Sequence, residues 1–231
     1  RVRGEISLTT VGRYLNGWGM SPQKPVRRAY ERNDAAIGRW LRTEYPPIAR
    51  QARQERAMIH SGAEMGLRSD HVSGTSFAPR GQTPIVRATG QRFGCNMISA
   101  ITNRGHLAFM VFHGKFDGRL FIRFMQRLLK QAPGKLYLIV DGHPVHRSVV
   151  AIKFVSANAE RLRLIRLPGY CPELNPDELL NQDVKTNGLG KSRPTDRTEM
   201  MAGVRSHLRR RQRQPQVIRN LFQEKHVRYA A

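Results

Sequence analysis

The sequence has few acidic residues for its length. Its 231 residues include 17 aspartates and glutamates against 40 lysines and arginines, so the formal net charge is +23 and the isoelectric point is about 11.4. Solubility needs far less charge than this, and a field of one sign attracts molecules of the opposite sign. We therefore expect a polyanion as the partner, with nucleic acid as the first candidate.

Long apolar runs and cysteines are also scarce. No uncharged apolar span is long enough to cross a membrane and no secretory signal is present, so we expect no membrane partner and a cytoplasmic location. The two cysteines, Cys95 and Cys171, have neither the number nor the spacing of a disulfide framework or a metal site, which fits a reducing compartment. Because the chain begins with Arg1 and not with methionine, its start is interpreted as a cut.

One apolar run of the sequence ends in an acid. Residues 135–141 read Lys-Leu-Tyr-Leu-Ile-Val-Asp and lie between two glycines, which predicts a strand buried on both faces. A carboxylate at the end of such a strand is costly to desolvate unless a cation or hydrogen bonds meet it. Since open α/β sheets carry their chemistry at the carboxyl ends of strands, Asp141 is the first candidate for a functional residue. The alternative is an aspartate that only caps the following turn.

Strand and helix patterns alternate along the chain in an order that indicates the fold. The order β-β-β-α-β-α-β-α, followed by helices, predicts an α/β, ribonuclease H-like fold: a mixed five-stranded sheet flanked by helices, with an N-terminal helical remnant of a helix-turn-helix DNA-binding region. The expected strands are 57–64, 94–102, 106–112, 135–141 and 161–167, and the expected helices are 7–15, 35–41, 117–131, 143–159, 176–186 and 195–213.

Changes in composition divide the chain into three expected domains. Residues 1–53 are interpreted as a helical region with a partial helix-turn-helix and a linker, although a surface helix of the main domain is the alternative for the first stretch. Residues 54–190 contain the strands and are expected to form the α/β domain that carries the chemistry. Residues 191–231 are expected to form a basic helical extension.

A second acid stands at a predicted helix start. Asn175, Pro176 and Glu178 have the residue types of an N-cap, a first helical position and a third helical position, so Glu178 is a candidate member of a capping box. The other interpretation is that this helix start lies beside the strand of Asp141, so that two carboxylates meet. In a protein this basic, they would hold Mg²⁺ or Mn²⁺ against a phosphodiester, as two ions about 3.5–4 Å apart.

Four ordered motifs resemble those of the IS630/Tc1/mariner transposases, most closely the bacterial IS630 branch. They lie at 18–25, 76–84, 140–146 and 167–178 and read WGMSPQKP, SFAPRGQTP, VDGHPVH and LPGYCPELNPDE. The resemblance implies a DDE-type transposase that cleaves DNA with the help of metal ions and transfers the strand in cut-and-paste transposition. It also implies that Asp141 and Glu178 are catalytic and bind the metal. The implied partners are terminal inverted repeats and target DNA, bound by a homodimer at the bacterial nucleoid.

The first acid of the family pattern is missing. The pattern [WF]-x-D-E-x-G corresponds to residues 61–66, in which Ala63 stands where the first catalytic aspartate is expected. A methyl group cannot bind Mg²⁺, strand alternation turns Glu64 to the opposite face, and Asp70 would substitute only if its loop folded back. We therefore expect a transposase whose catalysis is impaired. The alternatives are a catalytically dead DNA-binding relative and another ribonuclease H-like nuclease.

Further residues are candidates for contacts around this site. His143 and His146 are expected to hydrogen-bond to phosphate or to the metal-binding carboxylates, with helix capping as the alternative. Asp177 and Asp183 are expected to face solvent. The arginines expected to contact DNA phosphates are Arg80, Arg161, Arg163, Arg166, Arg209, Arg210 and Arg211.

Overall fold

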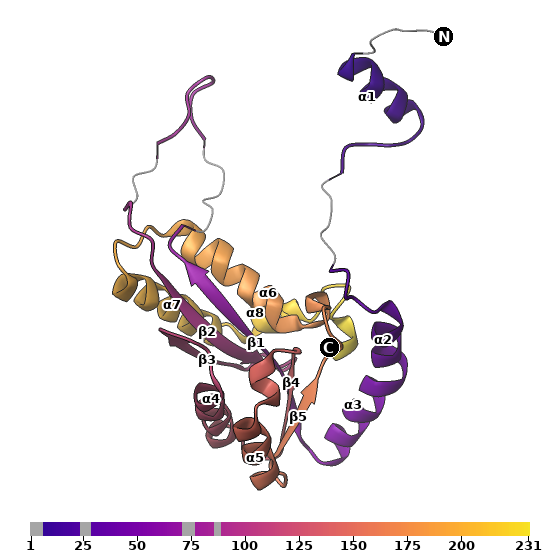
Figure 1. The fold of residues 1–231 in the computed structure, drawn as a ribbon, viewed down its shortest axis with the longest axis vertical. Coiled ribbons are helices and arrows are strands. Elements are labelled where there is room, and N and C mark those ends of the chain that lie inside the picture. The colour runs from indigo at the N-terminus through magenta and orange to yellow at the C-terminus, as the bar shows by residue number, and fades with distance from the viewer. Residues whose placement is uncertain (1–6, 24–28, 71–76, 86–88) are drawn as a thin grey trace. The chain divides into compact units, whose positions relative to one another are not determined.

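A mixed sheet of five strands lies at the centre of residues 31–231 in the computed structural model, which describes residues 7–23, 29–70, 77–85 and 89–231 (Figure 1). The strands lie side by side in the order β3-β2-β1-β4-β5. β1 pairs antiparallel with β2 and parallel with β4, which confirms the expected mixed sheet. The strands are β1 (Met58–Arg68), β2 (Gly94–Ile101), β3 (Leu107–Phe112), β4 (Leu136–Val140) and β5 (Leu162–Arg166).

The central strand β1 runs past the end expected at residue 64. Met65 and Leu67 are still buried, and they alternate with neighbours that are more exposed, so the strand continues along β2 to Arg68. Ser61 lies beside Ile139 of the parallel strand β4. Counting two residues further along both strands brings position 63 level with position 141, at the carboxyl end of β4.

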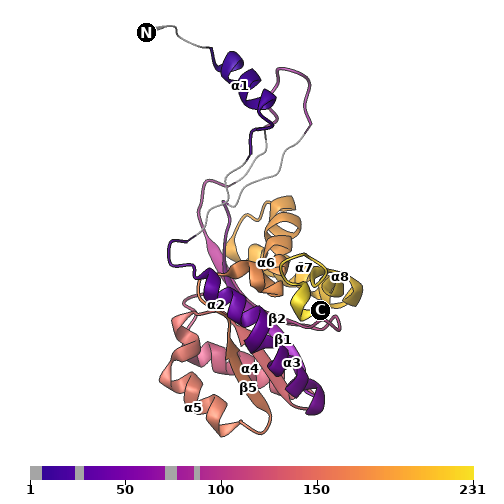
Figure 2. The ribbon, with the colours of Figure 1, turned by 90° about the vertical axis from the view of Figure 1, so that its right-hand side faces the viewer.

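Helices cover both faces of the sheet (Figures 1 and 2). On one face lie α4 (Gly118–Gln131) and α5 (Val149–Ala157), whose buried side chains share a hydrophobic cluster with β4. The helices on the other face are α2 (Asp34–Arg39), α3 (Tyr45–Gln54), α6 (Pro176–Asp183), α7 (Arg197–Gln212) and α8 (Pro215–Leu221), with π-helical turns at Trp40–Glu44 and Val184–Gly188.

None of the helices within the described ranges is long and apolar enough to cross a membrane.

Helices from both ends of the sequence contribute to the core of this sheet. Trp40 before α3, Leu208 of α7 and Ile218 of α8 share one hydrophobic cluster with Ile139 of β4. The compact unit accordingly spans Glu31–Ala231. The division of the chain into three functional domains stays a prediction.

A second unit, Arg1–Tyr30, contains helix α1 (Leu8–Gly17). The hydroxyl oxygen of Ser7 accepts a hydrogen bond from the backbone N–H of Thr10 at 3.2 Å, which caps the helix. This confirms the helix expected at 7–15. None of the side chains of α1 is buried within its unit.

The single helix expected at 143–159 is wrong, because the chain bends at Ser148. A 3₁₀ helix, Pro144–Arg147, precedes the bend, and α5 begins at Val149. Ser148 is extended, its hydroxyl donates to the carbonyl of Val145 at 2.8 Å, and its oxygen accepts from the N–H of Ala151 at 3.4 Å. A serine that bonds to both flanking turns favours this break over a continuous helix.

Asp183, expected to face solvent, instead joins α6 to α7. Its two oxygens each accept a hydrogen bond from the guanidinium of Arg211 at 2.7 Å, and one of them also lies 2.7 Å from Nε2 of His207. Burial alone would raise the pKa of Asp183, but the hydrogen bonds from His207 and Arg211 outweigh it and hold the pKa well below its usual range. The ionised carboxylate therefore stabilises the fold.

Replacing this carboxylate should destabilise the protein in a pH-dependent way. At neutral pH we expect Asp183→Asn to lower the free energy of unfolding by roughly 3–5 kcal/mol, because the Arg211 guanidinium loses its acid in a largely buried site. A lowered pKa stabilises the fold above the unfolded value of about 4 and ceases to do so as the pH falls. Urea unfolding should show the gap between variant and wild type closing below about pH 4.

The matched control is Glu160→Gln, which makes the same charge change at an exposed position. It should alter the free energy of unfolding by less than about 0.5 kcal/mol. Equal losses in the two variants would show that the ion pair contributes nothing beyond net charge.

Candidate active site

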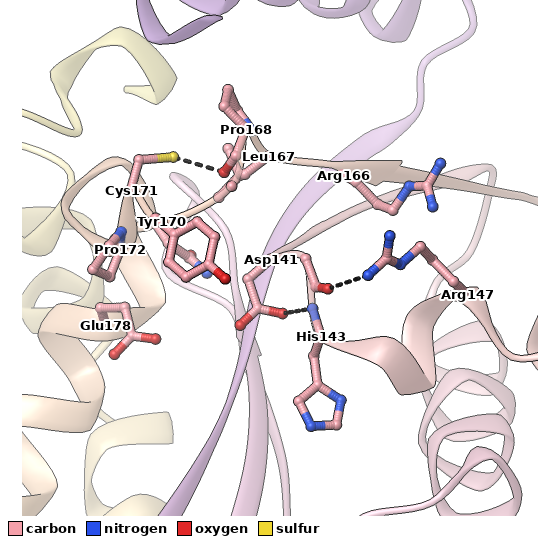
Figure 3. Close-up of a pocket in the computed structure, with 13 residues that line it drawn as sticks. Asp141, His143, Arg147, Arg166, Leu167, Pro168, Tyr170, Cys171, Pro172 and Glu178 are labelled. Atoms are coloured by element: carbon pink, nitrogen blue, oxygen red, sulfur yellow. Dashed lines mark hydrogen bonds between the residues drawn. The ribbon is translucent and has the colours of Figure 1, made fainter. Parts of the chain in front are cut away.

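Asp141 and Glu178 line one pocket of about 610 Å³. Asp141 follows the last residue of β4, and Glu178 belongs to the first turn of α6. Figure 3 shows their carboxylates facing a common space. The structure thus brings together the two acids that the sequence predicted to meet. The remaining lining comes from Gly142, His143, Arg147, Asn175 and residues 166–172.

Asp141 is fixed by the residues that follow it. One carboxylate oxygen accepts a hydrogen bond from the backbone N–H of His143 at 3.0 Å and lies 3.2 Å from Nδ1 of His146. Burial would raise the pKa of Asp141, but these contacts with His146 and His143 outweigh it and lower the pKa. Asp141 is therefore held in its ionised form.

The two histidines do different things. His146 is buried, and its ring packs 4.7 Å from the ring of Phe121 while it contacts the Asp141 carboxylate. The ring of His143 accepts from the N–H of Val145 at 3.2 Å, so it caps the 3₁₀ helix. The expected contact with a carboxylate fits the side chain of His146. The alternative, helix capping, fits the side chain of His143.

The start of α6 is joined to the central strand by two buried side chains. Asn175 caps the helix by accepting from the N–H of Asp177 at 3.1 Å, and its amide donates to the carbonyl of Gly62 at 3.0 Å. Asp177 accepts from the N–H of Ala63 at 2.9 Å and from the hydroxyl of Ser99 at 2.6 Å. The expectation that Asp177 faces solvent is wrong: it is 0% exposed, and burial holds its pKa well above the usual range. These bonds fix the direction in which Glu178 leaves the helix.

Glu178 does not complete a capping box. A capping-box glutamate accepts from the N-cap N–H, but the N–H of Asn175 donates to the carbonyl of Pro172 at 2.9 Å. The Glu178 carboxylate instead faces the pocket and accepts from the amide of Asn181 at 3.2 Å. Burial raises the pKa of Glu178, and the nearby charge of Asp141 adds to the rise. A cation between the two carboxylates would relieve this repulsion.

Position 63 contributes no oxygen to the site. Ala63 is 3% exposed, and the carboxylate of Asp70 is paired with Arg68 at 2.5 Å. Glu64 is half-buried, and its pKa is raised by burial and by the charges of Asp141 and Glu178. It therefore lies within electrostatic range of both acids, although its strand position turns it to the face opposite Ala63.

The donor set fits one hard divalent cation. Mg²⁺ binds oxygen and commonly takes one or two protein carboxylates together with waters and substrate phosphates, which Asp141 and Glu178 match. Among the residues that the structure describes, no group of three or more His, Cys, Asp or Glu side chains is arranged to hold a metal ion. Position 63, where the sequence pattern predicts an acid, carries the methyl group of Ala63.

Two arginines stand beside the acids. Arg166 and Arg147 line the same pocket, and the guanidinium of Arg147 donates to the carbonyl of Gly142 at 3.4 Å (Figure 3). The sequence predicted Arg166 as a phosphate contact but missed Arg147. The position of Arg147 could have indicated this, because it lies in the segment directly after Asp141, close to the end of strand β4.

Most of the other arginines expected to contact DNA have partners within the protein. Arg161 donates to two backbone carbonyls at the end of α4, and Arg163 lies over the ring of Tyr137, with its guanidinium carbon 5.3 Å from the ring centre. Arg211 is paired with Asp183. Arg210 lies 3.0 Å from the ring of His207, whereas Arg80 and Arg209 are exposed. DNA contact by these residues stays a prediction.

The strand order and the helices on both faces define a ribonuclease H-like fold, with one acid after the carboxyl end of β4 and a second in the first turn of α6. A family model described as DDE superfamily endonuclease matches residues 61–201, and one described as winged helix-turn helix matches residues 1–44. The chain belongs to the DDE superfamily endonucleases. The family models confirm the DDE superfamily and the helix-turn-helix region that the four motifs predicted.

Solved structures of Mos1, a mariner transposase, share this fold. A Mos1 paired-end complex with the left transposon end is 13% identical, with a TM-score of 0.66, and the match covers 97% of this chain and 71% of that chain. The Mos1 paired-end complex with Mg is 15% identical, with a TM-score of 0.63, covering 98% and 72%. The Mos1 catalytic domain is 10% identical, with a TM-score of 0.55, covering 89% and 98%. A search of curated protein sequences gives no match.

The bonds at the start of α6 can be tested against another helix start. Asn175→Ala should lower the free energy of unfolding by roughly 2–4 kcal/mol, because it removes an N-cap and leaves the buried Gly62 carbonyl without its donor. Asn33 also caps a helix, accepting from the N–H of Ala36 at 2.9 Å, so Asn33→Ala should cost only about 0.5–2 kcal/mol. Denaturant unfolding measures both. Equal losses would mean that the Asn175–Gly62 bond does not stabilise the site.

Proposed function

We propose that this chain is a DDE-type transposase subunit that binds DNA ends and target DNA, with Asp141 and Glu178 holding a divalent cation against the scissile phosphodiester. The observation that carries the proposal is the convergence of these two carboxylates on one pocket in a member of the DDE superfamily. The Mos1 complexes with DNA and with Mg or Mn support it by their shared fold.

Each residue of the pocket has a distinct part in this proposal. A cation bound by Asp141 and Glu178 would neutralise charge on the phosphate and lower the barrier to attack on phosphorus. Arg166 and Arg147 would neutralise further phosphate oxygens on the other side of the pocket. His146 would orient Asp141, because its buried ring contacts the carboxylate and has no room to turn away.

Catalysis by this chain is proposed to be impaired by Ala63. Without an oxygen at this position, a second ion would lack the ligand that joins it to the first, and cleavage and strand transfer would lose the help of a paired-ion site. DNA binding does not need that ligand. The chain would then act as a DNA-binding relative of active transposases, and we propose that it binds as a homodimer.

Restoring the acid tests this account. We expect Ala63→Asp to raise metal-dependent cleavage of a transposon-end duplex by at least about 100-fold, equivalent to about 2.7 kcal/mol of transition-state stabilisation. Titration with Mn²⁺, followed by electron paramagnetic resonance, should show tighter binding or an additional ion in the variant. The double variant Ala63→Asp with Asp141→Asn is the control and should lose both gains. Equal cleavage by the unaltered chain and Ala63→Asp would refute the role given to position 63.

DNA binding is tested separately from cleavage. The affinity of the unaltered chain for duplex DNA should fall with salt, with a log–log slope of about −0.9 for each phosphate neutralised. Arg166→Ala should reduce the magnitude of this slope by about 0.9, the contribution of one phosphate. Arg161→Ala should change the slope less, because the guanidinium of Arg161 is bonded to carbonyls at the end of α4. A flat salt response would contradict the proposal. Equal affinity for inverted repeats and random duplex would favour another nuclease of this fold.

A further inference from the structure

Tyr170 stands at the pocket in an unusual backbone conformation. Its φ of 55° lies in the left-handed region, and its side chain is 59% exposed. Tyr170 lines the same pocket as Asp141 and Glu178 (Figure 3). A left-handed backbone conformation is strained for a bulky residue such as tyrosine.

Neighbouring residues force this arrangement. Leu167 is buried, and its N–H donates to the carbonyl of Val140 at 2.8 Å. Cys171 is also buried, and its thiol donates to the carbonyl of Pro168 at 2.8 Å. The chain between these anchors turns outward and presents the ring of Tyr170 to the pocket.

The left-handed conformation at this position has no helix-capping explanation. Among the described residues, the other non-glycine residue with positive φ is Arg56, which follows α3, where the N–H of Ala57 donates to the carbonyl of Ala52 in a helix-ending motif. Tyr170 follows a strand and a proline instead. Glycine would adopt this conformation with less strain, so the tyrosine side chain has a use that offsets the strain.

We propose that Tyr170 stacks on an unpaired base of the DNA strand whose phosphate lies at Asp141 and Glu178. This inference rests on the proposed DNA-processing function. The pocket carries cationic groups, Arg147 and Arg166, suited to phosphate, and an aromatic face suited to a base. A base inside a duplex is already stacked on both sides, so the ring can only receive one that is frayed, flipped out or at a single-stranded end.

Fluorescence of 2-aminopurine reports the stacking directly. DNA with this base at an unpaired terminal nucleotide should be quenched on binding the full chain with Mg²⁺, and Tyr170→Phe should keep the quenching because it keeps the ring. Tyr170→Ala should abolish it and weaken binding to this DNA by about 5–150-fold, the range for one stacked base. Its affinity for duplex with fully paired ends should change by less than about two-fold.

Tyr170→Gly separates this role from a structural one. Glycine relieves the backbone strain, so the melting temperature should stay equal or rise by about 1–3 °C while quenching is lost. A fall of several degrees, or an equal loss of affinity for paired and unpaired DNA, would overturn the proposal by showing that Tyr170 only shapes the loop. If the unaltered chain binds neither DNA, the proposed function itself fails. If the unaltered chain binds duplex DNA but does not quench 2-aminopurine, the stacking proposal fails and the proposed function stands.

Discussion

The hydrogen bonds between the first turn of α6 and strand β1 are the constraint on which the site depends. Asn175 and Asp177 reach across to the backbone of Gly62 and Ala63 and leave Glu178, one residue further round the helix, directed at the pocket. Because these hydrogen bonds are made to backbone atoms of β1, they do not depend on which side chains the strand carries. These hydrogen bonds are therefore present with Ala63 at position 63, and they do not depend on an acid there.

Charge is distributed so that the pocket differs from the rest of the protein. The chain carries a net charge of +23, yet Glu64, Asp141 and Glu178 influence one another at the end of β4. A basic surface draws a polyanion in, and a local acidic site then requires a cation to accept a phosphate. Tyr170 adds an uncharged, aromatic wall to the same pocket. In the proposed function, attraction, cation binding and base contact would be carried out by different residues.

The sequence allowed the sheet and both acids to be predicted, because each left a local signal. Asp141 ended a buried apolar run, and Glu178 stood at a helix start with its own cap residues. Asp177 and Asp183 were misplaced because a charged residue on a helix is usually at the surface, and only the packing of α6 on β1 and α7 reveals their partners. The sequence also showed the charges of Arg161 and Arg163 but not the carbonyls and the ring that contact them, and DNA contact by both stays a prediction.

The central claim is that Asp141 and Glu178 together bind a divalent cation and that the third ligand position is lost at Ala63. The most direct measurement is anomalous diffraction from crystals of this chain soaked in Mn²⁺. The account predicts one manganese peak with carboxylate oxygens of both acids at about 2.0–2.3 Å, and no second ion bound at Ala63. A peak coordinated by other residues, or none in crystals soaked at millimolar Mn²⁺, would contradict it.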